Sequence, residues 1–310
     1  MLAVVVIMYA IVGALIGAAV GIWMGEKYWL YGAAVMMTVA LVVAVYCYFA
    51  PTDGILRGFN SHQVYEGDRL YDIVAGIAEK THSPMPRVYV CDVDFPNAFA
   101  NGRTPETAFV AATAPLLDVL DNDQVEGVMA HEMSHIIHRD TIVDGTARNC
   151  VTVLTASAVI VGILANTANG ILKSVSKRGG LILLLAFIVL APLIAVGTLL
   201  SLTVPGAAIL LRFGVSRSRE YGADESSGRI TGRPLALASA LETIETGCSS
   251  KSNTYKDVST SSLWIANPFG KHREDLLMRM LSTHPSLESR IKRLQELDRE
   301  LNGGNLPSGK

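Results

Sequence analysis

Hydrophobic residues gather in four long stretches, at positions 1–23, 29–50, 151–172 and 181–211. A helix needs about 20 apolar residues to cross a bilayer. The first, second and fourth stretches meet that length, whereas Thr, Ser and Asn side chains dilute the third. Another stretch follows the first at once and no basic residue precedes it, so it is expected to stay as an anchor rather than be removed as a signal peptide. The pattern predicts two hydrophobic hairpins of transmembrane helices.

Polar sequence fills the intervals between these stretches and shows shorter periodicities. The first interval reads as a helix, then strands, then a helix, which is an α+β order. Its strand candidates flank a turn at Asn101-Gly102. The second interval contains a polar, Ser/Thr-rich stretch that is predicted to be a loop, followed by an amphipathic helix. The predicted elements are a helix at 65–80, strands at 86–92, 97–101 and 107–113, a loop at 247–262 and a helix at 286–301.

The pentapeptide His131-Glu132-Met133-Ser134-His135 carries the clearest chemistry. Residues four apart lie on one face of a helix, so both imidazoles can bind the same ion. Glu132 lies close enough to reach a water on that ion, which is the layout of a zinc hydrolase. Asp121 and its neighbours offer N-caps for such a helix. The alternative is an ordinary surface helix, but the flanking residues are apolar, and unpaired imidazoles are costly there.

A hydrolytic zinc site usually has three protein ligands, so a third ligand is needed. His138 comes too early on the same helix to reach the ion. Glu220 and Asp224 are four apart and share a helical face. Glu220 could bind zinc while Asp224 holds a ligand imidazole through its other nitrogen. Because another divalent ion can use these ligand types, zinc is an inference from chemistry.

Four stretches resemble the HtpX-like branch of a family of integral-membrane zinc metallopeptidases, the family that also contains the CAAX prenyl proteases. They are His131–Asp140 (HEMSHIIHRD), Ser216–Asp224 (SRSREYGAD), Phe95–Gly102 (FPNAFANG) and Thr283–Ile291 (THPSLESRI). The resemblance implies an α+β zincin-like (gluzincin) domain and one Zn²⁺ per subunit. The domain would combine residues 51–149 and 212–310, with transmembrane hairpins at 1–50 and 150–211.

The resemblance also implies a role for each matching residue. The expected zinc ligands are His131, His135 and Glu220, with Glu132 as the base that takes a proton from water. Several further residues are expected around them. Asp224 and Asp140 would support the ligands, Asn97, Ala98, Phe99 and Ala100 would pair with the substrate backbone, and His284 and Arg290 would stabilise the transition state. Tyr221, beside Glu220 in the sequence, is a further candidate for the transition state that does not rest on the resemblance.

The expected activity is endopeptidase cleavage of unfolded or damaged membrane proteins in quality control. A CAAX prenyl-protein protease is one alternative, and a non-catalytic membrane scaffold that keeps a metal site is another. Half of the chain is hydrophobic, 17% is charged and the net charge is −2, so no basic surface suggests nucleic acid. The four cysteines are scattered and indicate no disulfide framework. The expected partners are protein substrates and the lipid bilayer, and the oligomeric state is undetermined.

Lys and Arg near the ends of the hydrophobic stretches indicate orientation. Most lie on the side of the polar regions, which favours a site facing the cytoplasm. The resemblance implies the same orientation more strongly, in a multi-pass protein of the plasma membrane. The basic segment 173–178 conflicts with this, because it falls between the two stretches of the second pair. The sequence leaves open whether that pair spans the bilayer fully.

Overall fold

The computed structural model describes residues 27–49, 54–146, 217–251 and 285–303, with scattered positions from 149 to 170. Backbone contacts divide the chain into two units, Met1–Ala50 with Thr146–Gly214, and Pro51–Gly145 with Val215–Lys310. In the first unit the described element is α2 (Lys27–Phe49). The other three predicted hydrophobic stretches lie wholly or largely outside the described residues. Among the residues described, none of the helices combines the length and the hydropathy that crossing a bilayer requires.

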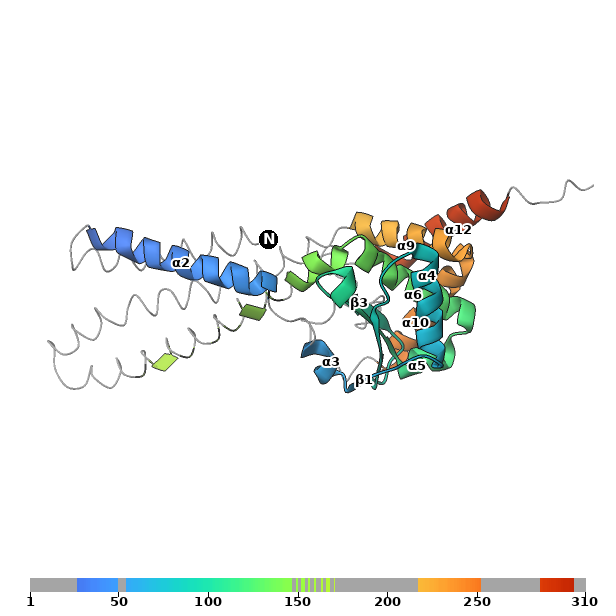
Figure 1. The fold of residues 1–310 in the computed structure, drawn as a ribbon, viewed down its shortest axis with the longest axis horizontal. Coiled ribbons are helices and arrows are strands. Elements are labelled where there is room, and N and C mark those ends of the chain that lie inside the picture. Colours follow the sequence, from blue (N-terminus) through green and yellow to red (C-terminus); the bar gives the residue numbers. More distant parts are fainter. Residues whose placement is uncertain are drawn as a thin grey trace, which may run out of the picture. The chain divides into compact units, whose positions relative to one another are not determined.

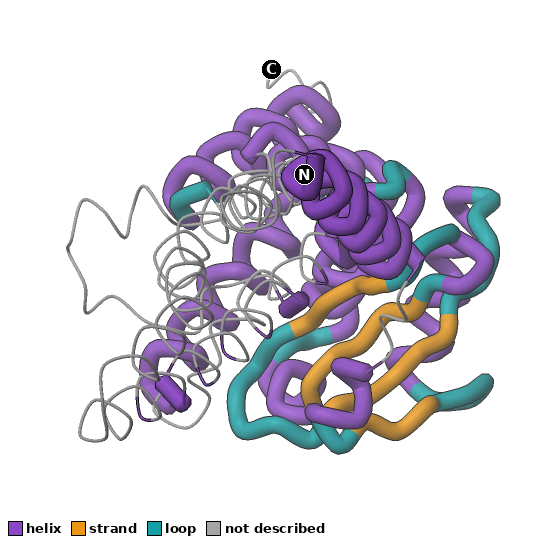
Figure 2. Tube along the Cα trace, turned by 90° about the vertical axis from the view of Figure 1, so that its left-hand side faces the viewer, coloured by secondary structure: helices purple, strands orange, loops and turns teal. Residues whose placement is uncertain are grey.

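The second unit contains a mixed sheet in the order β1-β2-β4-β3, whose strands lie side by side in Figure 2. The parallel pair β2 and β4 forms its centre, and β1 and β3 pair antiparallel at the edges. Three strands confirm the predicted ones, whereas β1 was not predicted because Ser-His-Gln shows no apolar alternation. The strands are β1 (Ser61–Gln63), β2 (Arg87–Cys91), β3 (Ala98–Asn101) and β4 (Phe109–Thr113).

The connection from β3 to β4 is longer than a tight hairpin turn. It includes a 3₁₀ turn, η1 (Pro105–Thr107). Gly102 begins the connection at a φ of 138°, in the region that favours glycine. A Cβ at this position would lie 2.4 Å from the Cα of Ala108. The predicted turn at Asn101-Gly102 is therefore the start of the connection, and it requires glycine because another backbone passes too close for a side chain.

Two predicted elements differ in extent from the structure. The first predicted helix begins later, because Asp68 caps it by accepting a hydrogen bond from the Leu70 N–H at 2.8 Å. The predicted loop at 247–262 is wrong at its start, since helix α10 continues through Lys251; its remainder lies outside the described residues. The helices of this unit are α3 (Gly54–Gly58), α4 (Arg69–Thr81), α5 (Ala114–Val119), α6 (Asn122–Ile137), α9 (Arg217–Thr231), α10 (Pro234–Lys251) and α12 (Leu287–Asn302).

Helix α6 lies at the centre of the packing (Figure 1). It contacts α4, α9 and α10, and also β3 and β4. Close contact with α10 depends on Gly127, where a Cβ would lie 3.2 Å from backbone atoms of Leu237. Helix α12 packs on α9 and α10 and buries Leu294 and Leu297 of its predicted apolar stripe. The result is one core that joins the two polar regions of the sequence.

Candidate metal centre

Helix α6 places His131, Glu132 and His135 at the centre of the domain. Its start is fixed by a capping box, in which Asp121 and Gln124 each accept a hydrogen bond from the other's backbone N–H. This confirms the N-cap expected near Asp121. His131 is 1% exposed and Glu132 is 4% exposed, so both polar side chains are held where water reaches them poorly.

Helix α9 brings Glu220 and Asp224 to the same place, and both are buried. They occupy one face because they are four residues apart. The hydroxyl of Ser227, one turn beyond Asp224, donates to the carbonyl oxygen of Gly127 on α6 at 2.7 Å. This buried bond fixes the position of α9 along α6 and therefore the position of Glu220 opposite the histidines.

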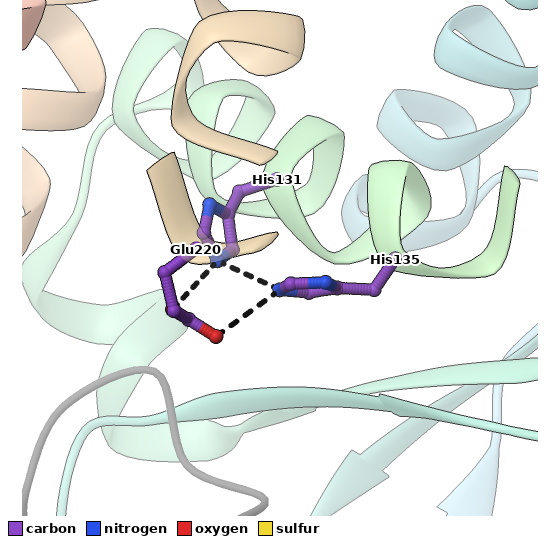
Figure 3. Close-up of side chains that lie close together, drawn as sticks. All are labelled: His131, His135 and Glu220. Atoms are coloured by element: carbon purple, nitrogen blue, oxygen red, sulfur yellow. Dashed lines mark hydrogen bonds and ion pairs between the residues drawn. The ribbon is translucent and has the colours of Figure 1, made fainter. Parts of the chain in front are cut away.

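Three ligand atoms face one another in a triangle (Figure 3). The Nε2 atoms of His131 and His135 are 3.2 Å apart. The Glu220 oxygens lie 3.8 Å from Nε2 of His131 and 3.7 Å from Nε2 of His135. A tetrahedral zinc ion with bonds of about 2.0–2.1 Å requires ligands about 3.3 Å apart. The spacing of the two nitrogens therefore fits zinc, and the Glu220 side must contract, because its two distances belong to different carboxylate oxygens.

Both histidines point the same nitrogen at this triangle because a carboxylate faces the other one. Nδ1 of His131 lies 3.0 Å from Oδ1 of Asp224, and Nδ1 of His135 lies 3.1 Å from Oδ2 of Asp140. When Nδ1 carries the proton toward a carboxylate, Nε2 presents a lone pair to the metal. The chemistry of the donor set thus matches zinc as well as the spacing does.

Asp140 reaches His135 through a break in the helix. Arg139 has a φ of 62°, in the left-handed region, and α6 ends just before it. Positions five apart do not share a face in a continuous helix. A new helical segment begins at Asp140, and the change of direction returns its carboxylate to His135.

The buried surroundings of Glu132 shift the pKa of its carboxyl group. Burial raises the pKa of Glu132, and the neighbouring Glu220 adds to this, while His131, His135 and the backbone N–H of Ala100 act in the opposite direction. The net change is upward. A carboxyl group shifted this way holds a proton more readily than an exposed one.

Arg290 lies in the same buried cluster, but its side chain contacts Asp224. Its Nε donates to Oδ2 at 2.8 Å and its Nη2 donates to Oδ1 at 2.6 Å. Nη1 is 4.0 Å from Oε2 of Glu220. Burial alone would raise the pKa of Asp224, but the Arg290 guanidinium and the hydrogen bond with His131 hold that pKa far below its usual range. Asp224 is consequently ionised at neutral pH.

Arg219 is a member of the cluster that the sequence did not single out. Its guanidinium lies 3.7 Å from Asp140 and 3.7 Å from Asp144. The available signal was its place beside Glu220, but Arg-Glu neighbours are common on surface helices. Its partner Asp140 comes from a distant part of the chain, so only the folded structure reveals the contact.

Three further positions considered from the sequence are Tyr221, His284 and His138. The centre of the Tyr221 ring lies 3.7 Å from the guanidinium of Arg293. The role of Tyr221 in the transition state stays a prediction. His284 lies outside the described residues. His138 is the exposed C-cap of α6. Within the described part of the chain, the metal-binding group contains His131, His135 and Glu220 and does not include His138.

This arrangement, a largely buried His-His-Glu set beside an acidic residue, is that of a zinc metallopeptidase. Residues 66–298 match the model of peptidase family M48, and the chain belongs to that family. A protease HtpX homologue from Pyrococcus furiosus is 35% identical over 302 residues, covering 93% of this chain and 96% of the relative. A second, from Campylobacter concisus, is 31% identical over 300 residues, covering 94% and 95%. The protein is an M48 zinc metallopeptidase of the HtpX type.

A solved structure also aligns with the chain. It is the crystal structure of Ste24p from S. mikatae, with a TM-score of 0.49 and 15% sequence identity. The alignment covers 93% of this chain and 64% of that one.

Proposed function

We propose that this chain is a membrane-anchored endopeptidase that cleaves unfolded or damaged membrane proteins. The observation that carries the proposal is the position of β3, an edge strand that lies beside α6. A bound polypeptide in extended form can add to such an edge through backbone hydrogen bonds. Recognition through the backbone tolerates many side chains, which suits unfolded substrates.

The register of β3 supports this role for its outer edge. The Thr113 N–H donates to the carbonyl oxygen of Asn97 at 2.9 Å, so the odd-numbered residues of β3 face β4. In an antiparallel pair the intervening residues turn their N–H and C=O groups the other way. These are Ala98 and Ala100, and the Ala100 N–H reaches the Glu132 carboxylate. A substrate strand at this edge would lie against the base.

The side chains divide the chemistry between them. When bound, zinc supplies Lewis acidity and lowers the pKa of a coordinated water. Glu132 takes the proton from the attacking water and then passes it to the leaving amine. Its raised pKa suits this double use. We retain Tyr221 and His284 as candidates for transition-state contacts.

The proposed mechanism is tested by Glu132→Gln, with Asp118→Asn as control because Asp118 is an exposed carboxylate on α5. Glu132→Gln should lower the rate of casein cleavage by about 10²–10⁴-fold, the usual contribution of a general base. Zinc content should remain one ion per chain, since Glu132 is not a ligand. Full cleavage by the zinc-loaded variant would contradict the assignment of the base.

The same assay separates the alternative functions. Cleavage of a farnesylated peptide without cleavage of unfolded protein would favour a CAAX-type protease. Zinc binding with no cleavage of either substrate would favour a scaffold. Zinc-dependent cleavage of several unfolded proteins by the parent chain alone supports the proposal.

Membrane anchoring is supported by the first unit. Residues 28–49 contain no Asp, Glu, Lys or Arg, and large apolar side chains of α2 are exposed, among them Tyr31, Leu41, Val42 and Phe49. So many exposed large apolar side chains on one helix are unusual for a soluble monomer. The chain should stay in membranes washed with alkaline carbonate. A C-terminal fluorescent reporter should be active if the site faces the cytoplasm, and an active phosphatase reporter would reverse that orientation.

A further inference from the structure

Arg290 is an arginine with 2% of its surface exposed, brought to the metal centre by the C-terminal helix α12. It makes two hydrogen bonds to Asp224, one to each carboxylate oxygen. Asp224 in turn lies 3.0 Å from Nδ1 of His131. A chain of contacts therefore leads from α12 through α9 to a ligand on α6.

We propose that Arg290 is a positioning residue, which fixes His131 as a zinc ligand by orienting Asp224. The C-terminal helix thereby completes the metal centre. This inference concerns the zinc site alone and does not depend on the substrate.

The geometry of the pair gives the physical reason. A guanidinium that binds both oxygens of a carboxylate prevents the carboxylate from rotating about its last bond. The Asp224 oxygen that faces His131 is then held in one place, and the tautomer and orientation of the imidazole follow. A lysine would supply the charge as a single point without the second hydrogen bond.

The packing of α12 holds Arg290 itself. Ser286 caps the helix one turn before Arg290, through the backbone N–H of Ser289. Leu294 and Leu297 are buried on the following turns. A Cβ on Gly228 of α9 would lie 2.5 Å from Leu297, so the two helices are in close contact. The Arg290 side chain is therefore fixed at its base by the packing of α12 and at its guanidinium by Asp224.

The corresponding contacts behind His135, through Asp140 to Arg219, are looser. Arg219 lies 3.7 Å from Asp140 and its side chain is 20% exposed. Arg290 lies 2.6 Å from Asp224 and its side chain is 3% exposed. These differences in distance and exposure assign the stronger positioning role to Arg290 of α12.

The test compares Arg290→Gln, Arg290→Lys and the parent chain, purified in detergent. Arg299→Gln is the matched control, because it removes an exposed arginine from the same helix. Zinc affinity is measured by competition with a chelator, and the absorption spectrum of the Co²⁺-loaded protein reports ligand geometry. Both readouts are independent of peptide cleavage.

Arg290→Gln should weaken zinc binding by about 10–100-fold, the usual effect of losing a group that orients a ligand, and should change the Co²⁺ spectrum. Arg290→Lys should resemble Arg290→Gln, and Arg299→Gln should resemble the parent. Because a buried carboxylate left unpaired could unfold the domain, Asp224→Asn and Asp224→Asn/Arg290→Gln are measured too. If Arg290 acts through Asp224, its loss should cost little further affinity in the Asp224→Asn background.

Three results would overturn the proposal. The first is parental zinc affinity and spectrum in Arg290→Gln, even if cleavage is slower, since Arg290 would then act on the transition state. The second is full recovery in Arg290→Lys, which would show that charge alone matters. The third is additivity of the two losses in the double variant.

Discussion

At the scale of single residues, the metal centre depends on contacts behind the ligands. Each ligand histidine faces a carboxylate, and each carboxylate faces an arginine. The carboxylates select the nitrogen that binds metal, and the arginines balance their charge. Substitutions in this outer group should therefore alter metal binding without removing a ligand.

Arg219→Gln should have a smaller effect than Arg290→Gln. Its carboxylate partners are 3.7 Å away and its side chain is 20% exposed. Partly exposed ion pairs contribute about 0–1 kcal/mol, so zinc affinity should fall by less than about fivefold. Chelator competition measures it, and a loss as large as that of Arg290→Gln would contradict the ranking.

Zinc binding should release about one proton per chain at pH 7. Burial lowers the pKa of His135, but the hydrogen bond with Asp140 and the charges of Glu220 and Glu132 raise it to about 9. The Nε2 atom of His131 also faces the Nε2 atom of His135, at 3.2 Å. The metal-free imidazole is therefore protonated at pH 7, and zinc must displace that proton. Apparent affinity should rise with pH until about pH 9.

Calorimetry in two buffers of different ionisation enthalpy measures the proton release. His138→Gln is the control, because His138 is exposed at the end of the same helix. It should release the same number of protons as the parent. Zinc binding with no buffer dependence in the parent would contradict the assignment to His135.

At the scale of elements, two glycines of α9 have opposite surroundings. A Cβ at Gly228 would lie 2.5 Å from Leu297 and 3.1 Å from Pro234, whereas no described atom lies within 4 Å of a Cβ at Gly222. Gly228→Ala should destabilise the fold by about 1–3 kcal/mol through overpacking. Gly222→Ala should be neutral or stabilising by up to about 1 kcal/mol, since alanine favours helix.

Denaturant unfolding of the two variants measures this difference. Leu297→Ala should remove part of the cost of Gly228→Ala, because the closest clashing atom is gone. Equal stability of Gly228→Ala and Gly222→Ala would contradict the close packing of α9 on α12.

At the scale of the whole molecule, the zinc ligands lie on helices from two distant parts of the sequence. His131 and His135 lie on α6, and Glu220 lies on α9, after the second hydrophobic pair. A ligand that binds only the folded state stabilises it by mass action. The zinc site should therefore contribute to the stability of the domain as well as to its chemistry.

Chelation should lower the melting temperature of the parent chain. At a free zinc concentration 100 times the dissociation constant, the stabilisation is about 2.7 kcal/mol, which corresponds to about 5–10 °C for a domain of this size. His131→Ala should show no such shift, because it lacks a ligand. An equal melting temperature with and without chelator in the parent would contradict a stabilising site.

Local patterns were enough to predict the parts of the fold that depend on near neighbours. The spacing of His131 and His135 places both on one helical face, and Glu220 and Asp224 follow the same rule. The alternation at 86–92 predicts β2 for a similarly local reason. Composition and the four hydrophobic stretches likewise indicate the class of protein. The ligand set and the zinc metallopeptidase class are confirmed by the structure and the comparisons.

Tertiary structure decided what depends on distant contacts. Asp140 meets His135 only because Arg139 breaks the helix, and Arg290 meets Asp224 only because α12 packs on α9. The last turn of α10 also departs from the predicted loop, since Ser and Thr permit either state. The sequence by itself determined which residues share a face and could bind zinc. Only the packing of α6, α9 and α12 decided which charges surround them, because those contacts join segments far apart in the chain.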